Sequence, residues 1–74
     1  MEEKDVAFLD LSVNGDPHRV PAGATVLDLL AGLGRDPRTV AVERNGRIVR
    51  RADFGGARLE AGDRLEVVHF VQGG

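Results

Sequence analysis

Cysteine is absent from this 74-residue sequence. Its side chains can therefore form neither disulfides nor thiolate metal sites, and they cannot carry a persulfide or a thioester. A chain of this length forms one domain, close to the smallest size that folds without such cross-links. We therefore expect residues 1–74 to form a single domain with an economical fold, in which a helix packs on a sheet.

An excess of charge and long apolar runs are also missing. Ten Lys and Arg residues against twelve Asp and Glu give a net charge of -2, which leaves no basic surface for a nucleic acid. Residues 1–5 lack the basic and apolar regions of a signal peptide, and no apolar run is long enough to cross a membrane. We expect a cytoplasmic protein that binds neither nucleic acid nor membranes, with residues 1–5 disordered.

Residues that could form a metal or catalytic site are few. The two histidines, His18 and His69, are isolated, and no spacing of Cys, His or carboxylates predicts a metal ligand set. Asp28 falls where a helix start favours negative charge, and Asp63 falls in a turn, so both are interpreted as structural. The glycine pair at 55–56 lacks the Lys-Ser/Thr that follows in a phosphate loop. The residues therefore predict no metal site and no acid–base pair.

The first ordered segment reads as a β-hairpin. Over residues 8–13, Leu9, Leu11 and Val13 share one face and the residues between them share the other, which is typical of a half-buried strand. Asn14-Gly15 supplies residues that tolerate positive φ in a tight turn. Residues 18–20 then form the returning strand, which Pro21 ends.

A single helix follows this hairpin. Thr25 is a suitable N-cap, and Gly34 is placed to end the helix. The apolar positions repeat at the spacing of one helix face: Val26, Leu29, Leu30 and Leu33. A helix of about nine residues is not stable alone, so this apolar face must lie on the sheet.

A second hairpin and a final strand complete the pattern. Residues 39–44 are β-branched and alternating, Asn45-Gly46 is a second hairpin turn, and residues 48–49 form a short partner strand. Residues 52–58 are irregular, with Phe54 as an expected core anchor. A turn at residues 61–63 leads into the last strand, residues 64–71.

The order of elements predicts an α+β protein of the β-grasp (ubiquitin-like) class. We expect a mixed sheet of four to five strands with one helix packed across it, followed by a flexible Gly-Gly tail. The first and last strands should lie side by side in the centre, where Leu65 and Val67 can meet Leu11 and Val13.

The last strand also predicts a docking surface. If Leu65 and Val67 face the helix, alternation turns Glu66, Val68 and Phe70 to the opposite side. Exposed Val68 and Phe70 favour a docking patch for a partner protein. The alternative is that Phe70 only covers the sheet edge or packs on Phe8. Four arginines could add a cationic rim or form an ordinary solvated face: Arg44, Arg47, Arg50 and Arg51.

The sequence ends in Gln72, Gly73 and Gly74. Without a Cβ, a glycine pair can thread a channel that is too narrow for other residues. The functional group that it would deliver is the α-carboxylate of Gly74. We interpret residues 72–74 as a mobile tail that presents this carboxylate to another enzyme, and the alternative is a frayed terminus without function.

Taken together, these segments resemble the ubiquitin-like sulfur carriers, and among them the carriers of thiamine biosynthesis. The resemblance covers nearly the whole chain after residue 7. It lies in four segments and the terminal glycine pair: VNGDP (13–17), VPAGATVLDLL (20–30), VAVERNGRIV (40–49) and LEAGDRLEVVHFVQGG (59–74).

The resemblance implies a carrier and not an enzyme. An E1-like activating enzyme would use ATP and magnesium to adenylate the carboxylate of Gly74, and this chain would bind no cofactor itself. A sulfur donor such as a cysteine desulfurase would then convert the adenylate to a thiocarboxylate, from which thiazole synthase would take the sulfur. The free carrier is expected to be a monomer.

Other functions remain open on the sequence alone. Related carriers with the same fold and tail deliver sulfur to molybdopterin or to a tRNA base. A β-grasp interaction module would bind a partner through its sheet and would tolerate loss of the glycines. A protein modifier would be found joined to lysine side chains.

Overall fold

The computed structural model describes residues 7–70 of the chain. The predicted disordered start at 1–5, the end of the last strand at Val71 and the tail at 72–74 lie outside these residues. The described part contains the following elements: β1 (Phe8–Val13), β2 (Asp16–Pro21), α1 (Val26–Gly32), η1 (Pro37–Thr39), β3 (Val40–Arg44), β4 (Arg47–Val49), η2 (Arg51–Asp53) and β5 (Arg64–His69). Within residues 7–70, no helix is long and apolar enough to span a membrane.

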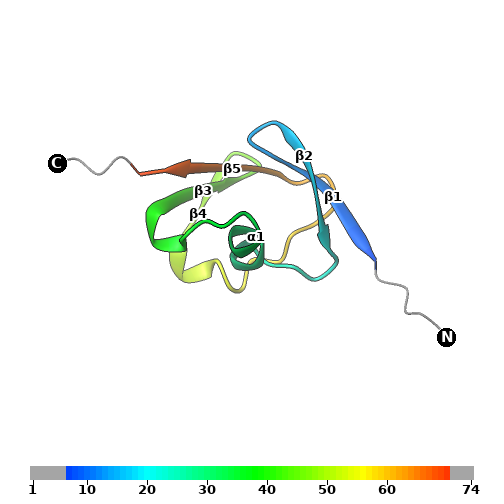
Figure 1. The fold of residues 1–74 in the computed structure, drawn as a ribbon, viewed down its shortest axis with the longest axis horizontal. Coiled ribbons are helices and arrows are strands. Elements are labelled where there is room, and N and C mark those ends of the chain that lie inside the picture. Colours follow the sequence, from blue (N-terminus) through cyan, green and yellow to red (C-terminus); the bar gives the residue numbers. More distant parts are fainter. Residues whose placement is uncertain (1–6, 71–74) are drawn as a thin grey trace.

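The strands form one mixed sheet in the order β2-β1-β5-β3-β4. The two central strands, β1 and β5, run parallel, with Val13 beside Leu65, whereas the other neighbours are antiparallel. Helix α1 crosses one face of this sheet, and the opposite face is left uncovered by any helix of residues 7–70 (Figure 1). The predicted β-grasp fold and the central pairing of first and last strands are confirmed.

Both predicted hairpin turns are present. Asn14 and Gly15 have φ angles of 52° and 86°, and Asn45 and Gly46 have φ angles of 54° and 85°. Positive φ at both central residues defines the type I′ turn, whose twist matches that of the strands that it joins. The two Asn-Gly pairs therefore fix the registers of β1 with β2 and of β3 with β4.

Helix α1 begins at a capping box and ends at a glycine. The Thr25 hydroxyl accepts a hydrogen bond from the Asp28 N–H at 3.2 Å, and the Asp28 carboxylate accepts one from the Thr25 N–H at 3.0 Å. At the other end, Gly34 has a φ of 72° and donates to the Ala31 carbonyl, while the Arg35 N–H reaches the Leu30 carbonyl at 2.9 Å. This is a Schellman ending, and it explains why the helix stops where Gly34 predicts.

The core lies between α1 and the inner face of the sheet. Phe54 enters it from the loop after β4 and is only 2% exposed, so its predicted role as an anchor is confirmed. The buried apolar residues form one cluster: Leu11, Val13, Val20, Ala24, Val26, Leu29, Leu30, Val40, Val42, Phe54, Leu59 and Leu65. This one core supports the whole sheet, including the strand that leads toward the C-terminus.

The element boundaries differ from the predictions by one or two residues, and β5, predicted to reach residue 71, ends at His69. The returning strand β2 is longer than predicted, because it pairs with β1 along Asp16–Pro21. Strand β3 starts at Val40, since Asp36 caps the short helix η1 by accepting a hydrogen bond from the Arg38 N–H. These shifts do not change which residues of β5 face the core.

Candidate functional site

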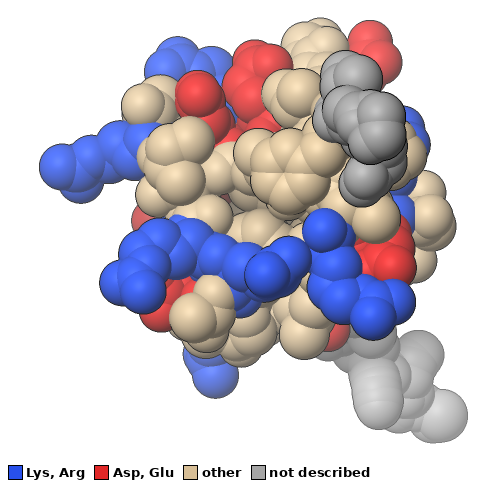
Figure 2. Space-filling view, turned by 90° about the vertical axis from the view of Figure 1, so that its left-hand side faces the viewer, with Lys and Arg blue, Asp and Glu red and all other residues tan. Residues whose placement is uncertain are grey.

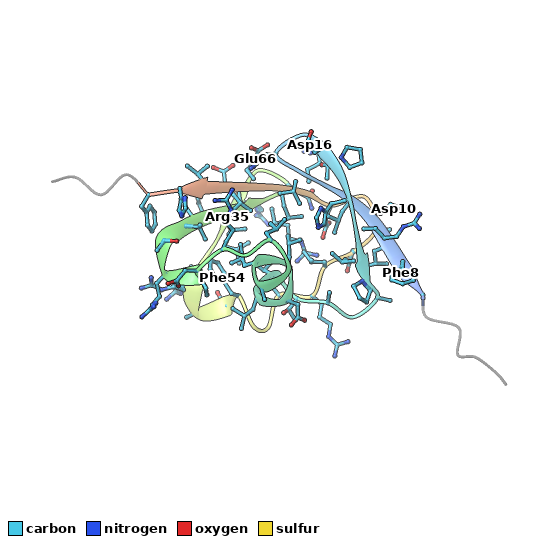
Figure 3. All side chains as sticks on the ribbon, in the orientation of Figure 1. Phe8, Asp10, Asp16, Arg35, Phe54 and Glu66 are labelled. Carbon is cyan, nitrogen blue, oxygen red and sulfur yellow. The ribbon has the colours of Figure 1, made fainter. Side chains whose placement is uncertain are left out.

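The side chains of β5 alternate between the core and the uncovered face of the sheet. Leu65 is 1% exposed and Val67 packs against the core, whereas Glu66 is exposed and Val68 is 58% exposed. Glu66 points away from α1 (Figure 3). The predicted division of β5 into a core face and an outer face is therefore correct.

Two glutamates lie opposite each other on this outer face. Glu43 of β3 is the direct cross-strand partner of Glu66, and neither carboxylate forms an ion pair with another residue of the described part of the chain. Like charges at such positions destabilise a sheet. Both glutamates line an open hollow together with Val68 and Arg64, so the hollow has two acidic residues, one basic residue and an apolar wall.

Phe70 lies in a different hollow. It directly follows β5, donates its N–H to the Thr39 carbonyl at 2.9 Å and is 49% exposed. Together with Val49 and Phe54 it lines a hollow of about 270 Å³ beside the part of β3 that extends past the end of β4. The structure thus places Glu66 and Val68 in one hollow and Phe70 in a second hollow.

The alternative contact between Phe70 and Phe8 is wrong. Ser12 of β1 pairs with Arg64 of β5, and the two strands are parallel. Phe8 precedes this pair and Phe70 follows it, so they lie about ten strand residues apart, or roughly 30 Å. Phe8 lies near the start of β1, at the opposite end of the sheet from the end of β5 (Figure 3).

The four arginines do not form one cationic rim. Arg50 and Arg51 line the hollow of Phe70, and basic side chains form a band across this end of the molecule beside an uncharged area (Figure 2). Arg44 donates to Asp63 at 2.9 Å, and it lines a separate hollow with Arg47. Only the first two can therefore contribute to a surface around Phe70.

Asp63 has a larger structural role than the sequence indicated. It is 6% exposed, and its carboxylate accepts hydrogen bonds from Arg44 Nε at 2.9 Å, Asn45 Nδ2 at 3.0 Å and the Glu60 N–H at 2.8 Å. Burial alone would raise the pKa of Asp63, but these hydrogen bonds and the charge of Arg44 outweigh it, so the pKa is lowered. Asp63 thus joins the end of β3 to the turn that begins β5.

The two histidines and the C-terminal tail are the remaining positions for which the sequence makes a prediction. Among residues 7–70, no three His, Asp or Glu side chains lie close enough together to hold a metal ion. His18 lies on β2 and His69 ends β5, where its ring contacts Thr39 and Arg35. Gln72, Gly73 and Gly74 lie outside the described residues, so the structure describes the strand that leads to them and not the tail itself.

Comparison with protein families gives a match to nearly the whole chain. Residues 11–74 match the model of the ThiS family. A curated relative, the sulfur carrier protein ThiS of Bacillus subtilis, is 40% identical over 50 residues, which are 68% of this chain and 76% of that protein.

Two further relatives are larger proteins. The thiazole synthase of Magnetococcus marinus is 47% identical over 66 residues, and that of Paramagnetospirillum magneticum is 42% identical over 66 residues. In both cases the match covers 89% of this chain. The chain spans about a fifth of the length of these two relatives, 20% in each case.

Solved structures give the same fold. The crystal structure of the thiamine biosynthesis protein (ThiS) of Geobacter metallireducens superposes with a TM-score of 0.77 at 33% identity, covering 89% of this chain and all of that one. The solution structure of a thiamine biosynthesis protein from the same organism gives a TM-score of 0.72.

Proposed function

This chain belongs to the ThiS family, and we propose that it carries sulfur for thiamine biosynthesis as a substrate of its partner enzymes, without catalysing a reaction itself. The observation that carries this proposal is the family match, which runs from β1 to Gly74 and includes the glycine pair. The β-grasp fold shared with the Geobacter metallireducens protein supports it.

The reacting group in this proposal is the carboxylate of Gly74. A free carboxylate is a poor electrophile, so it needs a leaving group before a sulfur nucleophile can attack it. An E1-like activating enzyme supplies this group: the carboxylate attacks the α-phosphate of ATP, with magnesium as counter-ion, and pyrophosphate leaves. Sulfide then displaces AMP and leaves a thiocarboxylate. Where the donor is the persulfide of a cysteine desulfurase, its outer sulfur displaces AMP to form an acyl disulfide, and a thiol reduces the S–S bond to release the thiocarboxylate.

The partners, and not this chain, supply the acid–base groups and the charge stabilisation. The residues described here offer no metal ligand set, and Asp63 is committed to hydrogen bonds within the fold. The glycine pair suits a partner that encloses the tail, because a backbone without Cβ atoms fits a narrow channel. Within this proposal, Gln72 and Gly73 are the residues that connect the reacting group to the folded domain.

Thiazole synthase is the proposed acceptor of the sulfur. Two relatives named thiazole synthase contain a segment of about this length that is 47% and 42% identical to this chain. A carrier segment and its acceptor in one polypeptide favour a functional link between the two. No feature of the fold favours delivery to molybdopterin or to a tRNA base.

We assign Glu66, Val68 and Phe70 to the partner-binding surface. Ile48 of β4 is 66% exposed on the same outer face as Val68, so apolar area extends beyond β5. The carboxylates of Glu43 and Glu66 add negative charge without a partner among residues 7–70. This surface fits a partner that presents an apolar side chain next to a Lys or an Arg.

The remaining expectations are also part of the proposal. One core joins all the strands, which supports a single domain, and we expect the free carrier to be a monomer. A cytoplasmic location would give the carrier access to ATP and to its activating enzyme.

A transfer assay with two tail variants tests the function. Deletion of Gly74, or addition of one residue after it, should abolish the transfer of sulfur to thiazole synthase, because the carboxylate no longer reaches the site of activation. Unchanged circular dichroism would show that the domain remains folded. Retained transfer in either variant would refute the assignment of Gly74.

A further inference from the structure

Strand β5 has a neighbour on its β1 side along only its first residues. Ser12 pairs with Arg64 and Val13 pairs with Leu65, and after that β1 turns away at Asn14. On the other side, β3 pairs with β5 from Leu65 to His69. The half of β5 that leads toward the tail would therefore be an open edge on the β1 side.

The side chain of Asn14 closes this edge. Its Oδ1 accepts a hydrogen bond from the Val67 N–H at 2.8 Å, its Nδ2 donates to the Val67 carbonyl at 3.1 Å, and its own N–H donates to the Leu65 carbonyl at 2.8 Å. A carboxamide has the donor and the acceptor of a peptide group. Asn14 thus extends the β1–β5 ladder by one side chain, after the backbone of β1 has turned away.

The second hairpin turn contacts the beginning of the same strand. Asn45 accepts a hydrogen bond from the Arg64 N–H at 2.8 Å, and its N–H donates to the Arg64 carbonyl at 2.8 Å. The two turns share one geometry, so the two asparagines are chemically matched. They differ in place and in the partner of Nδ2: Asn45 holds the start of β5 and also donates to the carboxylate of Asp63, whereas Asn14 donates to the carbonyl of Val67, the residue directly before Val68.

From this geometry we propose that Asn14 is a positioning residue for sulfur loading. By holding Val67, it keeps Val68 and Phe70 in the arrangement that the activating enzyme binds. The inference rests on the proposed function and adds a residue to it that lies outside the docking surface.

The turn itself does not require the Asn14 side chain. Glycine is accepted at the first central position of a type I′ turn, so Asn14→Gly keeps the backbone of the hairpin and removes only the carboxamide. The enzyme would then have to order the end of β5 when it binds, which weakens binding and leaves the chemical step unchanged. The expected signature is a raised KM with an unchanged kcat.

The experiment compares Asn14→Gly with the matched control Asn45→Gly under conditions in which both are folded. Amide hydrogen exchange of Val67 and Phe70 reports the order of the strand end, and initial rates of thiocarboxylate formation at varied carrier concentration give KM and kcat. For Asn14→Gly we expect exchange at Val67 and KM each to rise about tenfold, as the loss of two hydrogen bonds allows, with kcat within about twofold. For Asn45→Gly, KM should stay near that of the wild type.

A third variant separates the hydrogen bonds from general destabilisation. Asn14→Asp is accepted by the turn and keeps an acceptor for the Val67 N–H, but it sets a charged oxygen against the Val67 carbonyl, so its KM should also rise above that of the wild type.

Each contrary result has its own meaning. Unchanged exchange at Val67 in Asn14→Gly, or equal KM values for the two glycine variants, would refute the positioning role while the wild type is still loaded. Failure of the wild type to be loaded by a competent activating enzyme would refute the proposed function, and the positioning role with it.

Discussion

Replacement of Asp63 by asparagine should destabilise the fold far more than a single exposed charge would. The two side chains have nearly the same shape, so the change removes the charge and turns one acceptor atom into a donor. Both Arg44 Nε and the Glu60 N–H donate to one carboxylate oxygen, and Asn45 Nδ2 donates to the other. Either orientation of the new amide therefore leaves at least one donor facing a donor.

The expected loss follows from burial and from the number of donors. Asp63 is 6% exposed, so water cannot replace the lost hydrogen bonds. Asn45 cannot rotate its amide to compensate, because its Oδ1 already accepts from the Arg64 N–H. Loss of hydrogen bonds to a buried charge costs about 2–4 kcal/mol, which corresponds to a fall in Tm of roughly 10–25 °C for a domain of this size.

Asp10→Asn is the matched control. Asp10 also pairs with an arginine at 2.9 Å, the same distance as in the pair of Arg44 with Asp63, but both Asp10 and Arg19 are largely exposed. Thermal and urea unfolding of the two variants, followed by circular dichroism, should show a large loss for Asp63→Asn and little change for Asp10→Asn. Equal midpoints for the two variants would refute the structural role assigned to Asp63.

The pH dependence gives a second test of the same residue. The pKa of Asp63 is lowered in the folded protein. Its charge therefore stabilises the fold above the unfolded value of about 3.9, and this contribution is lost as the pH falls through the folded value. The difference in unfolding free energy between wild type and Asp63→Asn should be constant near neutral pH and should shrink below about pH 4. A difference that does not shrink in acid would contradict the charge-based explanation.

Three further predictions concern the core, the helix cap and the docking surface. Leu30 is 0% exposed, so Leu30→Ala should lower the free energy of unfolding in urea by about 2–5 kcal/mol. Leu27 is 42% exposed, so Leu27→Ala should lower it much less, and equal losses for the two variants would contradict the assigned packing of α1. Thr25→Ala should cost about 1 kcal/mol in the same assay, because it removes half of the capping box, and no loss would show that the cap is dispensable. Val68→Ser should raise the KM of the activating enzyme for the carrier several-fold without changing Tm. Phe8→Ser, at the other end of the outer face, should leave this KM unchanged. The reverse result would contradict the proposed position of the docking surface.

Local sequence signals were sufficient for most of the fold. The Asn-Gly pairs fixed the two hairpins because both central residues must adopt positive φ, and few other residue pairs do so readily. The apolar spacing of Val26, Leu29 and Leu30 fixed the buried face of α1. Alternation along β5 correctly separated Leu65 from Glu66, since a strand buried on one face repeats every two residues.

Contacts between distant segments could not be predicted in this way. The sequence alone indicates an ordinary turn residue at Asp63, because its partners Arg44 and Asn45 lie nearly twenty residues earlier in the chain. For Asn14 it predicts only the turn, since the contact with Val67 spans 53 positions. The contacts of Asp63 depend on the register of β3 with β5, and that of Asn14 depends on the register of β1 with β5. No local pattern specifies either register.

The candidate docking surface shows the same limit. The exposure of Glu66, Val68 and Phe70 followed from alternation, but their division between two hollows did not. That division arises because Phe70 lies beyond the end of β5 and next to the loop that carries Phe54. The cross-strand pair of Glu43 and Glu66 also required the register of β3 with β5.

The carboxylate of Gly74 is the centre of the proposed function, and the intact mass of the chain tests it most directly. The chain would be incubated with ATP, magnesium, its activating enzyme and sulfide, and its C-terminal fragments would be analysed by tandem mass spectrometry. The proposal predicts replacement of one oxygen by one sulfur, located at Gly74. An unchanged mass, with an activating enzyme shown to be competent on another carrier, would contradict the assignment of this chain as a sulfur carrier.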